Sequence, residues 1–391
     1  MYKIIHIHND VKFIDETAYF DNPLFNNEVV ILGKKGAYKG QYKETALYLK
    51  PSKLNLDRLI RNCSNADMVV CYNLCLIKSF VANRLPAHVK IVWRFFGHEL
   101  YRYDIDSMLS CLTQKMSKPA FFSLYNIRRR IGNIYSSLKN SIKSKSTIPN
   151  IIHDVEFEKA LNRVDFFLWH HKQEYDSLKK IWHNLPKFMN IPTIVNCSGQ
   201  GYSHKKGDKI ILGNSRNPQN NHFDIINIFL SNKNFYKYKI TIPFSYGKET
   251  NYSINLKNKV KNFDNIILSE DFLPLTEYEL IFKNAAAFVI NTFRQRALGN
   301  IFIALQNGVK IYLNEKNISY HVLLSQGFLV YSIDQLYEDL ENNSIRLSID
   351  DAKYNFDLFR QFNKENSIEL FQHRIQSVLI KNKNRKTSKR K

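Results

Sequence analysis

Several features that mark other classes of protein are missing from this sequence of 391 residues. No apolar run approaches the about 18 residues that a membrane-spanning helix needs, and the N-terminus, MYKIIHIHND, has no apolar stretch long enough for a signal peptide. Five unevenly placed cysteines do not suggest a disulfide framework, which favours a reducing cytoplasm. Cys71 and Cys75 have no second pair and no nearby histidine, so they are better explained as core cysteines than as zinc ligands.

Acidic residues are absent between Ser107 and His153, and over the whole chain Lys and Arg outnumber Asp and Glu by 57 to 35, for a net charge of +22. This excess favours an anionic partner such as a nucleic acid, an acidic membrane or a phosphate-bearing substrate. Apolar residues at spacings of three and four predict an amphipathic basic helix after Pro119. It is either a soluble surface helix, a membrane contact or a nucleic-acid contact. The basic residues expected to meet a membrane are Lys115, Lys118, Arg128, Arg129 and Arg130.

The last eleven residues, 381–391, are mostly basic and have no apolar anchor, so we expect them to be disordered. A zinc finger, an RNP-type strand and a helix-turn-helix are all missing from the sequence, and the positive charge is spread along the chain. Specific nucleic-acid binding is therefore not expected.

Short Ile- and Val-rich runs alternate with helical patterns along the chain, which is typical of buried parallel strands in doubly wound α/β domains. Five runs lie in the first half and six in the second, so we expect two such domains. The predicted strands are Tyr2–Ile7, Val29–Leu32, Met68–Val70, Val89–Trp93, Val164–Leu168, Lys209–Leu212, Tyr238–Ile242, Asn265–Leu268, Ala287–Ile290, Val309–Leu313 and Phe328–Tyr331.

A cluster of Gly, Ser and charged residues at Asn196–Asp208 suggests where the two domains separate. We expect a first domain over residues 1–200, which contains the basic segment 107–153, and a second over 201–347. A helical segment over 348–380, which either stays with the second domain or crosses back to the first, precedes the tail.

Two loops of the second half follow predicted strands and suit an anionic ligand. After the first strand come Gly213, Asn214 and Ser215, with Asn220 and His222 at the start of the next helix. Backbone amides at such a position form an anion site, although a plain strand–turn–helix with polar caps explains the pattern too. Arg294 and Arg296 follow the strand Ala287–Ile290, with Gln295 between them and Gly299 and Asn300 beyond. These arginines either bind a nucleotide diphosphate or form a surface pair in a turn.

Other strand ends carry residues with two possible roles. Pro243 and Tyr246 follow one strand, where the tyrosine either stacks on a base or closes the domain surface. Asn314 and Glu315 follow another, where the carboxylate either binds sugar hydroxyls or caps a helix. In the first half, His98 and Glu99 follow a strand and either act as a general base or form a packed aromatic corner with a cap. These patterns include no cluster of metal ligands, and the one D-x-D, at residues 104–106, is not at a clear strand end.

These ordered motifs resemble a known family. Arg294-Gln-Arg-Ala-Leu-Gly-Asn-Ile-Phe-Ile-Ala-Leu-Gln-Asn-Gly308, Gly213-Asn-Ser with Asn220 and His222, Pro243 with Tyr246, Leu313-Asn-Glu-Lys-Asn317, and Trp93 with Gly97 and Glu99-Leu-Tyr101 carry the resemblance. The chain is similar over residues 90–340 to the TDP-N-acetylfucosamine:lipid II N-acetylfucosaminyltransferases, also called 4-alpha-L-fucosyltransferases, of glycosyltransferase family 56. Asn300 stands where that family has Thr.

The resemblance implies a GT-B fold, in which two Rossmann-like domains face a central cleft. It further implies metal-independent transfer of a sugar, TDP-linked and fucosamine-like, to a polyprenyl-diphosphate-linked saccharide, with no cofactor beyond the nucleotide sugar. Such work in cell-surface polysaccharide synthesis would place the enzyme peripherally on the cytoplasmic face of the bacterial inner membrane. Arg294 would stabilise the leaving diphosphate, and Glu99 or His98 would activate the acceptor. The alternative is a basic protein that binds nucleotides or nucleic acid without catalysis.

Overall fold

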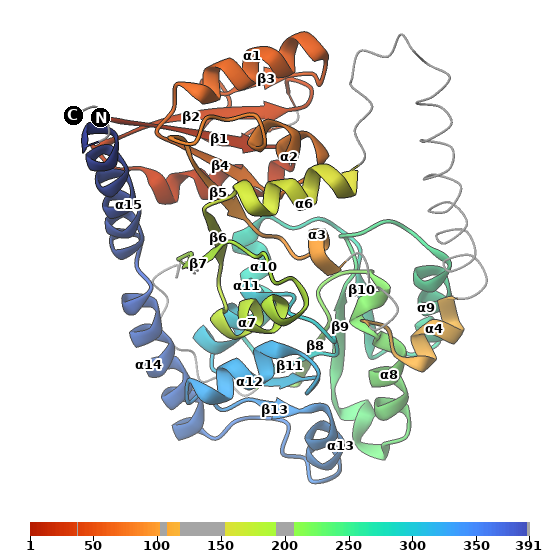
Figure 1. Ribbon diagram of the computed structural model, residues 1–391. Coiled ribbons are helices and arrows are strands. Elements are labelled where there is room, and N and C mark those ends of the chain that lie inside the picture. Colours follow the sequence, from red (N-terminus) through yellow and green to blue (C-terminus); the bar gives the residue numbers. More distant parts are fainter. Residues whose placement is uncertain (37, 102–107, 118–152, 193–206, 389–391) are drawn as a thin grey trace. The chain divides into compact units, whose positions relative to one another are not determined.

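The computed structural model describes residues 1–36, 38–101, 108–117, 153–192 and 207–388. The chain forms two compact units. The first comprises residues 1–103, 135–194 and 365–391, and the second comprises residues 104–134 and 195–364. Both are Rossmann-like α/β units built on a parallel sheet (Figure 1).

The sheet of the first unit has the order β3-β2-β1-β4-β5-β6-β7, and every neighbouring pair is parallel. The chain therefore adds strands outward from β1 in one direction and then, from β4, in the other, so the order reverses between β1 and β4. The strands are β1 (Tyr2–His8), β2 (Phe25–Leu32), β3 (Leu47–Leu49), β4 (Met68–Tyr72), β5 (Lys90–Arg94), β6 (Phe166–Trp169) and β7 (Lys187–Asn190).

Helices cover both faces of this sheet. Successive strand residues such as Ile4 and Ile5, whose side chains point to opposite faces, are therefore both buried. One face packs against α1, α2, α6 and α7, and the other against η1 and α15. The helical elements of this unit are η1 (Val11–Phe20), α1 (Lys53–Ser64), α2 (Leu76–Ala82), α3 (His98–Tyr101), α6 (His153–Arg163), α7 (Lys172–Ile181) and α15 (Ile368–Ser388).

The C-terminal helix α15 belongs to the core of the first unit. Phe371, Ile375 and Leu379 repeat every four residues and are all buried against the sheet face that η1 also covers. In Figure 1, α15 (dark blue) lies beside this sheet. Residues 381–388, for which composition predicted disorder, continue this helix; Asn382 is buried there and donates to His88 O (2.8 Å).

The sheet of the second unit has the order β10-β9-β8-β11-β12-β13 and is also parallel throughout. Its strand order reverses between β8 and β11. The strands are β8 (Lys209–Leu212), β9 (Lys239–Pro243), β10 (Ile266–Ser269), β11 (Ala285–Ile290), β12 (Lys310–Leu313) and β13 (Tyr331–Ser332).

Two hydrophobic clusters enclose this second sheet. One joins it to α8, α9, η4 and α13, with α4 at its margin, and the other joins it to α10, α11, α12 and α14. The helical elements are α4 (Cys111–Ser117), η3 (Pro218–Asn220), α8 (His222–Leu230), η4 (Lys233–Lys237), α9 (Asn251–Val260), α10 (Leu275–Phe282), α11 (Leu298–Gln306), α12 (Ile318–Ser325), α13 (Ile333–Glu341) and α14 (Ile349–Glu365).

The unit boundaries differ from the predicted ones in two respects. Residues 108–117, expected in the first domain, pack within the second unit. Within the predicted segment 348–380, residues up to 364 stay with the second unit and those from 365 join the first. The expected break at Asn196–Asp208 and the basic helix after Pro119 fall mainly or wholly outside the described residues.

Candidate functional site

The loops after β8 and β11 leave the second sheet where its strand order reverses. Ligands of open α/β sheets bind outside the carboxyl ends of strands at such a point. The two strands are paired in register, and Gly213, directly after β8, donates its amide to Val289 O of β11 (2.9 Å). The loops that carry Gly213 and Arg294 therefore begin side by side, as the two predicted anion loops require.

The loop after β8 depends on a glycine and a buried amide. Gly213 has φ of +72°, and a Cβ there would lie 2.5 Å from His222 Nε2. Asn220 is fully buried; its Oδ1 accepts from Asn214 N (3.3 Å), and its Nδ2 donates to Ser215 O (3.0 Å). Asn220 and Ser215, both predicted to bind the donor, thus hold the loop in shape.

His222 begins α8 and is fully buried. Its backbone amide donates to the Tyr252 hydroxyl (2.8 Å), and its Nδ1 lies 3.1 Å from the same oxygen. Burial lowers the pKa of His222 to about 3, so the ring is neutral. If the tyrosine proton is directed at Nδ1, the ring proton sits on Nε2. That buried Nε2 has no hydrogen-bond partner among the described residues, so in this tautomer it is an unused donor beside Gly213.

The loop after β11 carries two arginines of like charge. Arg296 donates through Nη1 to Gln219 Oε1 of the β8 loop and forms no ion pair with any carboxylate of the described chain. Burial, and then the charge of Arg294, lower the pKa of Arg296 to about 9. Among the described residues, the fold thus keeps a cation between the two loops without a carboxylate to neutralise it.

Asparagine side chains tie the strand-end loops together. Asn291, after β11, accepts on its Oδ1 from Asn314 Nδ2 (2.7 Å), and its backbone oxygen accepts from Asn221 Nδ2 (2.8 Å). Asn317 donates to the Thr292 hydroxyl (2.9 Å). Asn314, predicted to bind the donor, is therefore part of the scaffold that links the loops after β8, β11 and β12.

The remaining predicted donor residues are more scattered. Tyr246 is 54% exposed after β9, and its backbone oxygen accepts from Arg216 N (3.0 Å), whereas Pro243 and Gln295 are buried. Gly299 lies exposed in the first turn of α11, but Asn300 donates to the Tyr278 hydroxyl of α10 (2.7 Å). Glu315 is exposed and does not cap α12, because Asn317 is its N-cap and accepts from Ser319 N.

Sequence reasoning missed Gln219, Asn221 and Asn291 in this site. Asn221 has φ of +49° and occupies the N-cap position of α8. The one signal in the sequence was an asparagine directly before the predicted helix, since asparagine tolerates a positive φ. Nothing in the sequence indicated that Gln219 would meet Arg296, since the two residues are distant in the chain.

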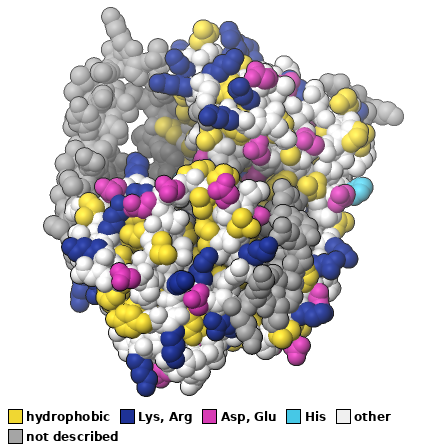
Figure 2. All heavy atoms as spheres, turned by 180° about the vertical axis from the view of Figure 1, so that it is seen from behind, with side chains coloured by type: hydrophobic (Ala, Val, Ile, Leu, Met, Phe, Trp, Pro, Cys, Tyr) yellow, Lys and Arg dark blue, Asp and Glu magenta, His cyan; other side chains and the backbone are white. Residues whose placement is uncertain are grey.

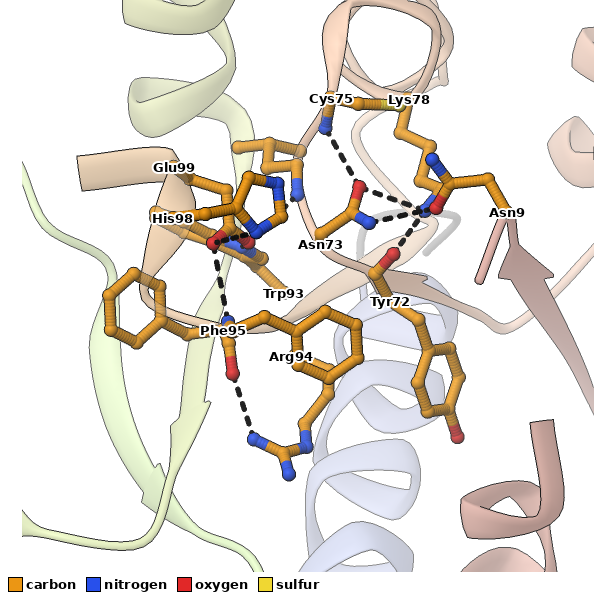
Figure 3. Close-up of polar contacts among 12 residues, drawn as sticks. Asn9, Tyr72, Asn73, Cys75, Lys78, Trp93, Arg94, Phe95, His98 and Glu99 are labelled. Carbon is orange, nitrogen blue, oxygen red and sulfur yellow. Dashed lines mark hydrogen bonds and ion pairs between the residues drawn. The ribbon is translucent and has the colours of Figure 1, made fainter. Parts of the chain in front are cut away.

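In the first unit, Glu99 is a buried carboxylate with several donors (Figure 3). It accepts from Trp93 Nε1 (3.1 Å), Leu74 N (3.3 Å) and Phe96 N (3.3 Å), and it lies 3.4 Å from His98 Nδ1. Glu99 is only 2% exposed, whereas the His98 side chain is 58% exposed. The carboxylate thus organises the packed aromatic corner, one of the two alternatives from sequence, and it also faces an accessible imidazole.

A buried lysine, which the sequence did not single out, joins β1 and β4 where the first sheet reverses its order. Lys78 Nζ donates to Asn9 Oδ1 (2.7 Å), Asn73 Oδ1 (3.1 Å) and the Tyr72 carbonyl (Figure 3). Burial lowers the pKa of Lys78. Since it is fully buried and its three acceptors belong to the protein, Lys78 fastens these loops.

Most of the residues predicted to contact a membrane lie outside the described residues. Lys115 is exposed on α4, but Lys118, Arg128, Arg129 and Arg130 lie outside the described residues, as does the D-x-D at 104–106. Within the described ranges no helix is long and apolar enough to cross a membrane, and no three His, Cys, Asp or Glu residues form a metal-binding group. Figure 2 shows Lys and Arg scattered over one face, with Asp and Glu among them.

Comparison with known proteins supports the fold. No protein-family profile and no curated protein matches the sequence. Among solved structures, Anabaena Alr3699/HepE in complex with UDP-glucose has a TM-score of 0.63 at 10% identity, over 97% of this chain and 100% of that one. An alpha-glucosyltransferase (AGT) in complex with UDP gives 0.56 at 10% identity, over 97% and 100%.

The pneumococcal O-GlcNAc transferase GtfA, in complex with UDP and GlcNAc, gives a TM-score of 0.50 at 10% identity over 84% of this chain. The chain spans 59% of that structure and 60% of the chain matched in a GtfA/B complex. These neighbours have the GT-B architecture, and the two Rossmann-like units described above are therefore of the GT-B type.

Proposed function

We propose that this protein is a glycosyltransferase that uses a nucleotide-sugar donor, held by its second unit. The observation that carries the proposal is Arg296, a cation between the β8 and β11 loops that lacks a carboxylate partner in the described chain. A diphosphate would supply the missing negative charge, and guanidinium groups suit phosphate oxygens. The GT-B neighbours solved with UDP or UDP-glucose support the same assignment.

Side chains and one helix would hold the diphosphate. Arg296 and Arg294 would contribute charge, His222 would donate from Nε2, and the N-terminus of α8 would present the positive end of its helix dipole. As the bond between the anomeric carbon and the diphosphate oxygen breaks, these groups would stabilise the negative charge on the leaving diphosphate. Because arginine provides that charge, we propose that transfer does not depend on a metal ion.

We propose His98 as the general base and Glu99 as its positioning residue. The carboxylate would hold the proton on Nδ1 and leave Nε2 free to accept the proton of the acceptor hydroxyl. That hydroxyl oxygen would then form the new bond to the anomeric carbon. Glu99 itself is buried and accepts three hydrogen bonds, so it would act through His98.

The finer assignments rest on the resemblance to family 56 and on charge. We propose a TDP-linked, fucosamine-like donor and a polyprenyl-diphosphate-linked saccharide acceptor used in surface polysaccharide synthesis. The net charge of +22 suits an anionic acceptor and peripheral binding to the cytoplasmic face of the inner membrane.

A thermal-shift panel with dTDP, UDP, GDP and CMP tests the donor class, because a ligand that binds only the folded state raises its melting temperature. We expect stabilisation by one nucleoside diphosphate, dTDP before the others. Release of that nucleotide from its sugar conjugate should require the lipid-linked acceptor and persist in excess EDTA. Binding without release would instead indicate a non-catalytic nucleotide-binding protein, and abolition by EDTA would refute metal independence.

A further inference from the structure

A short stretch of the first half of the sequence packs into the second unit. Residues Met108–Ser117 lie in the chain between α3 and α6, which both belong to the first unit. Leu112 and Met116 nevertheless pack at the margin of the core that α8 and α9 form. Asn255 of α9 donates to Met116 O (2.9 Å), and Figure 1 shows α4 (orange) beside α8 and α9 (green).

Ser110 is the residue through which this stretch reaches α8. Its backbone amide donates to Asn221 Oδ1 (2.9 Å), and its hydroxyl donates to Asp224 Oδ2 (2.6 Å). The same hydroxyl oxygen accepts from Thr113 N (3.0 Å), as a cap of α4 does. Burial raises the pKa of Asp224, and the Ser110 hydroxyl opposes that rise by stabilising the charged carboxylate.

Asn221 passes this contact on to the strand-end loops. Its side chain is fully buried, and its Nδ2 donates both to Met108 O (3.4 Å) and to Asn291 O after β11 (2.8 Å). Gln219 extends the link, because its Nε2 donates to Met108 Sδ (3.4 Å) while its Oε1 accepts from Arg296. One asparagine and one glutamine thus connect the stretch to both loops of the candidate donor site.

We propose that Met108–Ser110 is a positioning element of the donor site: it fixes Asn221 and Gln219, and through them the guanidinium of Arg296, for a nucleoside diphosphate. This inference rests on the proposed function. Without the element, the Gln219 side chain would lose its contact with Met108 and keep only Arg296. Asn221 would lose its hydrogen bonds to Met108 O and Ser110 N. Arg296 would then spend less time in one orientation, which weakens binding of a charged ligand.

Asn221→Gly tests the proposal without imposing backbone strain, since glycine adopts the positive φ of this position freely. Asn343→Gly is the matched control: Asn343 also has a positive φ (+56°), but it is exposed, and in the described residues its side chain accepts only from Lys237. Hydrogen exchange without ligand reports on loops 213–221 and 291–297, calorimetry gives the Kd of dTDP and UDP, and steady-state kinetics gives the donor KM.

We expect Asn221→Gly to speed exchange in both loops and to raise Kd and donor KM about tenfold, the loss of roughly one net hydrogen bond, with the acceptor KM unchanged. Asn343→Gly should stay within twofold of the wild type. If Asn221→Gly fails to fold, Ser110→Ala takes its place, because it removes the hydroxyl that bonds Asp224 and Thr113 and so holds the element against α8. Ser231→Ala, at the exposed C-terminal end of α8, is then the control. Exchange and affinity like the wild type would overturn the proposal. If the wild type binds neither nucleotide, the proposed function fails, while exchange in the two loops still decides whether the element positions them.

Discussion

The imidazole of His222 occupies the space where a side chain at Gly213 would lie, since a Cβ on Gly213 would be 2.5 Å from Nε2 of that ring. The start of the loop after β8 therefore packs against the first residue of α8. His222 Nε2 has no hydrogen-bond partner in the described chain. It lies beside the backbone of Gly213, at the edge of the sheet where the loop after β8 begins.

Gly213→Ala should therefore damage both folding and nucleotide binding. The positive φ and the contact with His222 together should lower the free energy of unfolding by about 2 kcal/mol or more. Gly299→Ala is the matched control: no atom lies within 4 Å of its Cβ position, and in a helix the change should be neutral or stabilise by up to about 1 kcal/mol. Urea unfolding measures both variants, and equal effects would refute the packing argument.

His98→Gln should lower kcat by about 10²-fold to 10⁴-fold, the usual contribution of a general base, with little effect on melting temperature because the side chain is exposed. His183→Gln, also exposed, is the control. A variant with the wild-type kcat would exclude His98 as the base.

Glu99→Gln should lower both stability and kcat. The amide oxygen can still accept on one side, either from Trp93 Nε1 and Leu74 N or from Phe96 N. The NH₂ group then faces a backbone amide on the other side, which leaves buried groups unsatisfied at about 1–3 kcal/mol. A pH–rate profile separates the two effects, because a purely structural residue would change the melting temperature and leave the profile of the folded enzyme as it was.

Acid should destabilise the fold through its buried histidines. Burial lowers the pKa of His6 and His171 to about 4 and that of His222 to about 3. The unfolded chain binds these protons near pH 6.5 and the folded chain does not, so stability present above pH 6.5 is lost as the pH falls below it. Each histidine should cost about 1.4 kcal/mol per pH unit. Chemical unfolding at pH 7.5 and 5.5 measures the loss, and equal stability at both would contradict it.

The C-terminal helix should stabilise the first unit. Ile375→Ala removes a fully buried side chain and should cost about 2–5 kcal/mol. Ile380→Ala deletes the same side chain where it is 40% exposed, so it should cost much less. Urea unfolding of the two variants gives the difference, and a similar loss for both would mean that burial against the sheet does not govern this helix.

The sequence was sufficient for most of the sheet strands, because buried parallel strands leave continuous Ile- and Val-rich runs. It missed β3 and β7, which are short edge strands with polar or aromatic residues, and the first half of β2, whose Asn26, Asn27 and Glu28 look like a loop. Residues 381–388 read as a disordered tail because the contacts of Asn382 and Lys383 with the first unit are non-local.

For the candidate site, the sequence indicated which loops would lie together, but not which of their side chains would hold the loops in shape. Position after a strand predicted that Gly213 and Arg294 would share one sheet edge. The sequence did not indicate that the side-chain amide of Asn220 would form hydrogen bonds with Asn214 and Ser215, or that Asn300 would donate to Tyr278. Those hydrogen bonds depend on side-chain orientation in the folded structure. The same holds for the hydrogen bond between Ser110 and Asn221, which are far apart in the sequence.

Calorimetry with dTDP and UDP on Arg296→Ala tests most directly whether Arg296 binds the diphosphate of a nucleotide sugar. The wild type should bind one of these nucleotides, and the variant should bind it about 100-fold more weakly, as expected for losing a charged donor worth about 3 kcal/mol. Arg360→Ala on α14, an exposed arginine, should bind as the wild type does. Unchanged affinity in Arg296→Ala, or no binding by the wild type, would contradict the account.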